Sequence, residues 1–314
     1  MPDASVVNVE SLVKRYRDLI ALDHLSMRIA PGEVFGLLGP NGSGKTTAIN
    51  CILQLLTYEK GAIELFGEKM TPSRYDLKRR IGIVPQSVAV FEELSVRENI
   101  DYFCALYIKD ATKRKTMVDE AIEFVGLGEH TRFRPRRLSG GLVRRLNIAC
   151  GIAHKPELIF LDEPTVAVDP QSRNAILEGI LRLNNEGTTV VYTSHYMEEV
   201  ESICSRIMIL DRGQVLASGS NSELKALIGT GEKILIETAA LPDDTLTRLR
   251  ALASVRSLNY DGAELAIACS GGSRNLSDVL DVLRAQDVSF GRVYSEPPTL
   301  NDVFLELTGK GLRD

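Results

Sequence analysis

Apolar side chains follow two different patterns along this 314-residue chain. Short and almost continuous apolar runs lie at residues 33–38, 158–161 and 188–193. Runs of this length are typical of central parallel strands that are buried on both faces of a sheet. Between about residues 92 and 150 the strand pattern is lost, and apolar side chains recur at helical spacing. The pattern predicts an α/β domain that carries a helical segment.

Antiparallel strands are predicted on both sides of this pattern. Residues 5–30 predict an antiparallel strand pair with Asp23 and His24 at its turn, and residues 61–67 alternate like an edge strand. Residues 207–217 predict a hairpin with an Asp-Arg-Gly turn. The first domain is therefore expected to end near residue 220.

The helical segment has a clear start. Ser95 and Glu98 have the spacing of a capping box at the beginning of a helix. Four large side chains follow at helical spacing: Tyr102, Phe103, Leu106 and Tyr107. We expect this stripe to pack internally, with a binding face as the alternative.

The last part of the chain has a pattern of its own. A linker is expected over residues 221–231, where a short helix leads to Gly-Thr-Gly. Residues 232–314 then predict strands at 233–237, 255–260, 264–268 and 288–293, with helices at 244–252, 276–285 and 300–307. The order β-α-β-β-α-β is that of a ferredoxin-like domain, so a small α+β domain is expected here.

A glycine-rich loop follows the first apolar run. It consists of Gly39, Pro40, Asn41, Gly42, Ser43, Gly44, Lys45, Thr46 and Thr47, and it fits the phosphate-binding pattern G-x-x-x-x-G-K-[ST]. Glycines allow backbone N–H groups to point at phosphates, and the start of the next helix adds partial positive charge. Lys45 can reach the β- and γ-phosphates, and Thr46 can ligate Mg²⁺. The preceding strand and the lysine favour a phosphate site over an ordinary glycine turn.

Two acids end the apolar run at residues 158–161. Asp162 and Glu163 are placed where open α/β sheets bind ligands, at the carboxyl end of a predicted central strand. Asp162 would hold Mg²⁺, and Glu163 would polarise an attacking water. An Asp-Glu turn after a core strand is the alternative, and the phosphate loop makes it the weaker one.

Between these motifs, residues 138–141 read Leu-Ser-Gly-Gly. Here the chain resembles the ATP-binding subunits of ABC transporters, whose signature motif is L-S-G-G and usually continues with Gln. Across roughly residues 5–220, further landmarks of that family occur in the same order. They are the adenine-stacking aromatic Tyr16, the Q-loop glutamine Gln86, the D-loop Asp169 and the switch histidine His195. Each has an ordinary structural explanation by itself, and their order together indicates the family.

The resemblance implies a P-loop NTPase core with an antiparallel β subdomain and a helical subdomain, and a pair of copies closed head to tail around two ATP molecules with Mg²⁺. Residues that would contact the nucleotide held by the other copy are Ser139, Gly140, Gly141 and Asp169. Catalysis would depend on Lys45, Gln86, Glu163 and His195. Metal binding would depend on Thr46, Gln86 and Asp162. A separate membrane-spanning permease subunit is also implied, which would hold the chain on the cytoplasmic face of the cell membrane.

Two positions depart from the family pattern. Leu142 stands where the signature usually continues with Gln, and residues 166–169 read Val-Ala-Val-Asp instead of Ser-Gly-Leu-Asp. An apolar residue followed by two arginines resembles the branch that exports drugs, ions, lipids or polysaccharides, and residues 298–309 resemble the end of such subunits. Glu92 and Glu93 are expected to contact the membrane subunit.

Composition excludes other partners. The net charge of -5 does not favour nucleic acid as the main partner, because nucleic-acid-binding proteins usually carry clustered positive charge. Five scattered cysteines favour reduced core thiols of a cytosolic protein over disulfides or a metal site. The first residues show no secretory leader pattern. No segment approaches the ~20 apolar residues of a spanning helix, so we expect any pore to be another chain.

Two other classes of ATPase share a phosphate loop. Soluble ABC proteins of translation or gene regulation usually carry two ATPase units, whereas one set of motifs is found in this sequence. Chromosome-maintenance ATPases need a long coiled coil between the phosphate loop and the signature, and none fits between residues 54 and 138. The C-terminal region is expected to support pairing or regulation, with a packing appendage as the alternative.

Overall fold

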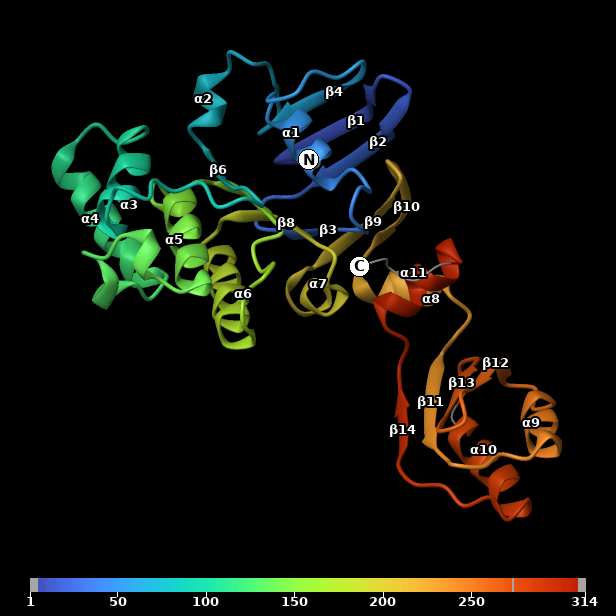
Figure 1. Ribbon diagram of the computed structural model, residues 1–314. Coiled ribbons are helices and arrows are strands. Elements are labelled where there is room, and N and C mark those ends of the chain that lie inside the picture. The colour runs from blue at the N-terminus through green and yellow to red at the C-terminus, as the bar shows by residue number, and fades with distance from the viewer. Residues whose placement is uncertain (1–4, 273, 310–314) are drawn as a thin grey trace. The chain divides into compact units, whose positions relative to one another are not determined.

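The computed structural model describes residues 5–272 and 274–309, which form two compact units with a boundary between Ser220 and Asn221 (Figure 1). The segment predicted as a linker, 221–231, contains helix α8 (Asn221–Leu227), which packs within the second unit against α11 (Leu300–Thr308). Among the helices of the two described ranges, each is too short or too polar to cross a bilayer.

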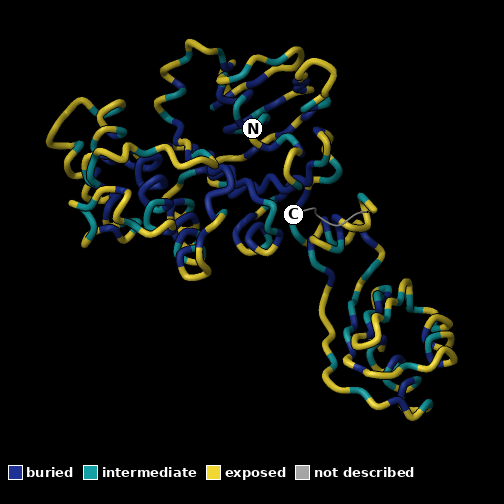
Figure 2. The backbone as a smooth tube through the Cα atoms, viewed as in Figure 1, coloured by how far each residue is buried: buried dark blue, intermediate teal, exposed yellow. Residues whose placement is uncertain are grey.

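A six-stranded sheet forms the centre of the first unit. Its order is β10-β9-β3-β8-β7-β6, and it is parallel except for β10, which is antiparallel to β9. The strands are β3 (Val34–Leu38), β6 (Ile81–Val84), β7 (Leu158–Asp162), β8 (Thr189–Ser194), β9 (Arg206–Asp211) and β10 (Gln214–Gly219). Every residue of β3, β7 and β8 is buried, as their apolar runs predicted (Figure 2).

The register of the parallel strands brings the functional loops together. Leu38 of β3 lies beside Ser194 of β8, and Asp162 of β7 lies beside Thr193. The carboxyl ends of the three strands therefore meet at one edge of the sheet. Helix α1 (Lys45–Ile52) lies on one face of this sheet, and α6 (Pro170–Asn185) and α7 (Met197–Ile203) lie on the other (Figure 1).

A four-stranded antiparallel sheet covers α1, in the order β2-β1-β4-β5. Its strands are β1 (Val7–Tyr16), β2 (Leu19–Ile29), β4 (Lys60–Leu65) and β5 (Glu68–Lys69). The predicted turn at Asp23 and His24 is wrong. The chain turns between β1 and β2, and these two residues form a bulge inside β2, where the pairing shifts and His24 has a φ of 52°. β4 is also not an edge strand, because β5 pairs with it.

The helical subdomain contains α3 (Val96–Ala105), α4 (Ala111–Phe124) and α5 (Gly140–Ile152). The capping box of Ser95 and Glu98 is confirmed. The expectation of an internal stripe holds for Tyr107, whose ring stacks at 3.8 Å on His154, but it is wrong for Tyr102 and Leu106, which are 46% and 61% exposed. Helical spacing located the stripe, and the packing of α4 and α5 against only part of it decided which residues are covered.

The second unit contains a four-stranded antiparallel sheet in the order β12-β13-β11-β14. Its strands are β11 (Glu232–Glu237), β12 (Val255–Tyr260), β13 (Glu264–Cys269) and β14 (Val293–Glu296), and helices α9 (Asp243–Arg250) and α10 (Asn275–Ala285) pack on the sheet. The element order is the expected β-α-β-β-α-β. The last strand begins at Val293 and not at Val288, which is part of the connection and packs into the core of this unit.

All five cysteines are buried and unpaired. They lie at positions 51, 104, 150, 204 and 269, and burial raises the pKa of each thiol, to about 11 for Cys51. A thiol with a raised pKa carries little thiolate at neutral pH. The structure thus agrees with core thiols.

Candidate functional site

The glycine-rich loop between β3 and α1 has a backbone that only glycine permits. A Cβ on Gly39 would lie 2.2 Å from the carbonyl oxygen of Leu210, and Gly44 has a φ of 110° with Ala21 O only 2.7 Å from its ideal Cβ. The loop carbonyls of Gly39 and Pro40 accept hydrogen bonds from Lys45 Nζ, at 2.8 and 3.2 Å. Ser43 Oγ is buried and makes no hydrogen bond among the described residues. The loop therefore holds donors that an anionic ligand could satisfy.

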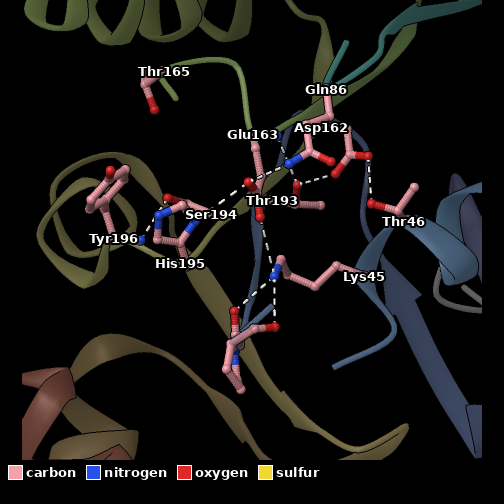
Figure 3. A network of polar contacts seen from close by, with 12 residues as sticks. Lys45, Thr46, Gln86, Asp162, Glu163, Thr165, Thr193, Ser194, His195 and Tyr196 are labelled. Carbon is pink, nitrogen blue, oxygen red and sulfur yellow. Dashed lines mark hydrogen bonds and ion pairs between the residues drawn. The ribbon is translucent and has the colours of Figure 1, made fainter. Parts of the chain in front are cut away.

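Asp162 lies between two hydroxyl groups. Thr46 Oγ1 donates to Asp162 Oδ2 at 2.8 Å, and Thr193 Oγ1 donates to Asp162 Oδ1 at 2.6 Å (Figure 3). Hydroxyl and carboxylate oxygens are ligands that Mg²⁺ prefers. Thr46 and Asp162 were predicted from the sequence, whereas Thr193 was not, although a polar residue at the end of an apolar strand was a signal for it.

Glu163 is the centre of the polar network in Figure 3. Its carboxylate lies 3.3 Å from Lys45 Nζ, 3.4 Å from His195 Nδ1, and accepts a hydrogen bond of 3.0 Å from Gln86 Nε2. The residue is buried, and its φ of 47° lies in the left-handed region. Such a conformation costs about 1–3 kcal/mol and often occurs at functional sites. The four residues predicted to act in catalysis are thus in contact.

The ammonium group of Lys45 is held in an unusual environment. Burial lowers its pKa, and the nearby charges of Glu163 and Asp162 oppose this shift. A buried cation gains most from an additional negative charge beside it. Lys45 is therefore suited to bind a phosphate group.

The signature residues lie apart from this network. Ser139 caps α5 through a hydrogen bond of 3.4 Å from Leu142 N, as predicted. Gly141 packs against the start of α6, where a Cβ would lie 2.4 Å from Ser172 Oγ. Asp169 caps α6 by accepting a hydrogen bond from Ser172 N, which lowers the pKa of its carboxyl group. Within the described residues, no hydrogen bond joins Ser139, Gly140 or Gly141 to Lys45 or Glu163.

The sequence also singled out Tyr16, Leu142 and the loop that contains Ala167. Tyr16 is 44% exposed at the end of β1, where Lys14 Nζ lies 5.1 Å from its ring. Leu142 packs against the core of the helical subdomain, so the departure from Gln has a structural role. Ala167, in the unusual D-loop, has a φ of 58° where the family pattern offers glycine.

Two buried charged residues near the site were not predicted as site residues, although Arg144 is one of the two arginines noted after Leu142. Glu199 Oε2 accepts hydrogen bonds from Thr165 at 2.8 Å, Tyr192 at 2.7 Å and Ser194 at 3.0 Å, which anchors the loop of His195. Arg144 donates to backbone carbonyls on both sides of the site. Neither residue has a local sequence pattern, because all but one of their partners are at least 7 residues away in the chain.

Known proteins resemble this chain in sequence. A family described as ABC transporter matches residues 22–166. The linearmycin resistance ATP-binding protein LnrL of Bacillus subtilis (strain 168) is 37% identical over 311 residues, which cover 98% of this chain and 100% of that protein. The daunorubicin resistance ATP-binding protein DrrA3 of Streptomyces coeruleorubidus is 36% identical over 319 residues, which cover 98% of this chain and 98% of that protein. The Nod factor export ATP-binding protein I of Paraburkholderia xenovorans (strain LB400) is 34% identical, with 100% of both chains covered.

Two solved structures resemble this chain over 71% and 68% of its length. The protein cbiO1 of Clostridium perfringens, part of the ABC transporter complex cbiONQ, has a TM-score of 0.66 and 27% identity, covering 71% of this chain and 91% of that one. A dimeric ATP-binding cassette, MJ0796, bound to ADP and phosphate in a post-hydrolysis state, has a TM-score of 0.63 and 27% identity, covering 68% of this chain and 98% of that one.

Proposed function

This chain belongs to the ABC transporter family of ATP-binding proteins, and on that premise we propose that it binds and hydrolyses ATP to power a membrane exporter. The observation that carries the proposal is the meeting of Lys45, Asp162 and Glu163 with their partners at the carboxyl edge of one parallel sheet. The names of relatives with 34–37% identity refer to antibiotic resistance and Nod factor export. They favour transport over a soluble ATPase of translation or regulation.

Different residues of the site would bind the phosphates, the adenine and the metal ion. Lys45 and the N–H groups of the loop would hold the phosphates, and Tyr16 would stack on adenine. Thr46 and Asp162 supply the oxygen ligands that fit Mg²⁺, and Gln86 can add its amide oxygen, because its amide nitrogen already binds Glu163. When bound, Mg²⁺ neutralises charge that develops on the phosphates during transfer.

Hydrolysis would follow from the position of Glu163. Its carboxylate would orient a water molecule and accept its proton as the water oxygen bonds to the γ-phosphorus and the bond to the β-phosphate oxygen breaks. Gln86 and His195 hold Glu163 from two sides, at 3.0 and 3.4 Å. Positioning and charge provide most of the catalysis in phosphoryl transfer.

A second copy of the chain would complete the site. Ser139, Gly140 and Asp169 are exposed and form no side-chain hydrogen bond or ion pair with their own phosphate loop among the described residues. Ser139 and Gly140 lie at the N-terminus of α5, which favours anions. We therefore infer a head-to-tail dimer in which each signature motif covers the other copy's ATP.

A membrane-spanning subunit is the second proposed partner. Phe91 and Tyr102 are 42% and 46% exposed and pack edge to face at 4.8 Å, next to the Q-loop. Glu92, predicted to meet that subunit, forms an exposed ion pair of 2.6 Å with Arg136. We propose that this face docks the permease, which would hold the chain on the cytoplasmic side of the membrane.

The variant Glu163→Gln tests the proposal. It should bind ATP but hydrolyse it at least about 100-fold more slowly, because the amide cannot accept the proton of water. ATP should then trap a dimer that is visible by gel filtration. The control is Glu157→Gln, which removes an exposed acid paired with Arg80 just before β7 and should turn over ATP normally. Normal turnover by Glu163→Gln, or a monomer under every condition, would contradict the proposal.

A further inference from the structure

Arg144 lies on α5, one turn after the signature motif, and its side chain is almost completely buried, with 4% exposed. A guanidinium group has five N–H donors in a fixed plane. Here each donor has an acceptor, and every acceptor is a backbone carbonyl. Nε donates to Pro164 O at 2.7 Å, Nη1 to Pro85 O at 3.2 Å and Gln86 O at 2.8 Å, and Nη2 to Asp162 O at 3.3 Å and to Glu163 O.

This arrangement costs free energy. A buried cation normally has a carboxylate within ion-pair distance. Arg144 has no such ion pair among the described residues, although Asp162 and Glu163 are close enough to favour its charge. Burial lowers its pKa, but an arginine remains protonated. The guanidinium of Arg144 is costly to bury and binds only backbone carbonyls, at residues 85–86 and 162–164. This suggests that it positions these two loops.

Arg144 also binds the strained residue of the site. Glu163 has a φ of 47°, a conformation that persists only where the surroundings fix it. Its backbone N–H donates to Thr193 Oγ1 at 3.0 Å, and its carbonyl accepts from Arg144. The same guanidinium binds the carbonyl of Gln86, whose side chain donates to the Glu163 carboxylate at 3.0 Å. One rigid fork thus sets the distance between the two residues that would handle water.

The helix that carries Arg144 is itself fixed to the Q-loop. Asn147, one turn further along α5, accepts a hydrogen bond of 3.1 Å from Ala89 N. The backbones of α5 and β6 also approach closely, since a Cβ on Gly82 would lie 2.5 Å from Gly151 O. The start of α5, the Q-loop and the end of β7 are therefore linked through Arg144.

We propose that Arg144 is a positioning residue for ATP hydrolysis: it holds the backbone of Gln86 and Glu163 in register with the helix that begins at the signature motif. This inference rests on the proposed function. Among the described residues Arg144 forms no hydrogen bond or ion pair with the phosphate loop, so its loss should lower kcat and leave the affinity for ATP nearly unchanged. A shift of about 1 Å in a catalytic group can lower a rate by about 100-fold.

The test uses the full-length chain with three substitutions. Arg144→Met removes the charge at similar length, Arg144→Lys keeps the charge but loses the fork, and Arg144→Ala leaves space for free guanidinium ion. We expect kcat to fall about 10- to 100-fold in all three, with the Kd for ATP changed less than about threefold. Guanidinium at low millimolar concentration should restore part of the kcat of Arg144→Ala and should not restore Glu163→Gln.

Two controls separate the possible outcomes. The first is Arg182→Met. Arg182 lies on α6 and also donates to a backbone carbonyl, Phe124 O, at 2.9 Å, and its removal should leave kcat normal. Lys45→Ala should abolish turnover. If the unmodified chain does not hydrolyse ATP, or if Lys45→Ala hydrolyses it equally fast, the proposed function is wrong. If turnover is present and Lys45→Ala abolishes it, two results would overturn this inference alone. The first is a folded Arg144→Lys variant with normal kcat. The second is that kcat of the Arg144 variants falls only in step with their melting temperature and guanidinium restores none of it. Should Arg144→Met and Arg144→Ala not fold, Arg144→Lys decides.

Discussion

At the scale of the residue, Glu163 shows how the site combines strain with support. Its φ is 47°, and its carboxylate lies within 3.0 to 3.4 Å of polar atoms of Lys45, Gln86 and His195. The energy of this conformation, about 1–3 kcal/mol, has to be balanced by contacts of its own backbone. Those contacts come from β8 and α5, through Thr193 and Arg144. The backbone of Glu163 is therefore held by two elements that are distant from it in the sequence.

The phosphate loop allows a matched test of backbone geometry. Gly44→Ala should abolish ATP binding, because its Cβ would lie 2.7 Å from Ala21 O and its φ is 110°. Gly67→Ala is the control: its φ is 77°, but nothing lies within 4 Å of the new Cβ. Both variants should lose about 1–2 kcal/mol of stability from the positive φ, and Gly44→Ala should lose more because its Cβ also clashes with Ala21 O. Only Gly44→Ala should lose nucleotide affinity. Titration with a fluorescent ATP analogue measures this, and equal affinities would contradict the role of the loop.

At the scale of the element, the sequence predicted those helices, strands and loops that are determined by residues close together in the chain. The buried strands β3, β7 and β8 follow from continuous apolar runs, and the phosphate loop follows from its fixed spacing. Asp23 and His24 show the limit of such reasoning: they have the polarity of a turn, but pairing with β1 makes them a bulge. Arg144 shows another limit, since its acceptors lie 18 to 59 residues away. Only the packing of α5 on the sheet reveals that it is buried.

The junction between α5 and β6 carries a prediction about pH. His154 follows α5, is buried, stacks on Tyr107 at 3.8 Å and lies 3.1 Å from Ile81 O through Nε2. Burial lowers its pKa from 6.5 to about 4. Between these values the unfolded chain binds the extra proton. The contribution of His154 to the free energy of unfolding is therefore fully present above pH 6.5 and is lost as pH falls toward 4, by about 1.4 kcal/mol per pH unit.

Urea unfolding at several pH values between 4.5 and 7 tests this prediction. His154→Gln should lower stability at pH 7 but flatten its dependence on pH across this window. His24→Ala, in which an exposed side chain is removed, should keep the slope of the unmodified protein. An identical slope in His154→Gln would show that other groups cause the acid sensitivity.

At the scale of the whole molecule, the chain consists of two units with separate cores. The first unit holds every residue of the proposed ATP site, from Tyr16 to His195. The second has a core of its own, built from strand residues such as Ile234, Ile236 and Ile267 and helix residues Val279 and Leu283. A domain of about 200 residues is large enough to bury a stable core alone. The boundary after Ser220 therefore gives a rational site for truncation.

Deletion of residues 221–314 from the Glu163→Gln variant tests what the second unit contributes. The remaining unit should fold and bind ATP with unchanged affinity, because the proposed nucleotide contacts all lie before residue 220. If the second unit supports pairing, its removal should weaken the ATP-dependent dimer about tenfold or more, since two linked contacts raise the effective concentration of each other. Analytical ultracentrifugation with ATP measures the dimer constant, with full-length Glu163→Gln as the control. An unchanged constant would instead make the second unit a packing appendage, and pairing would then depend on the signature and phosphate loops alone.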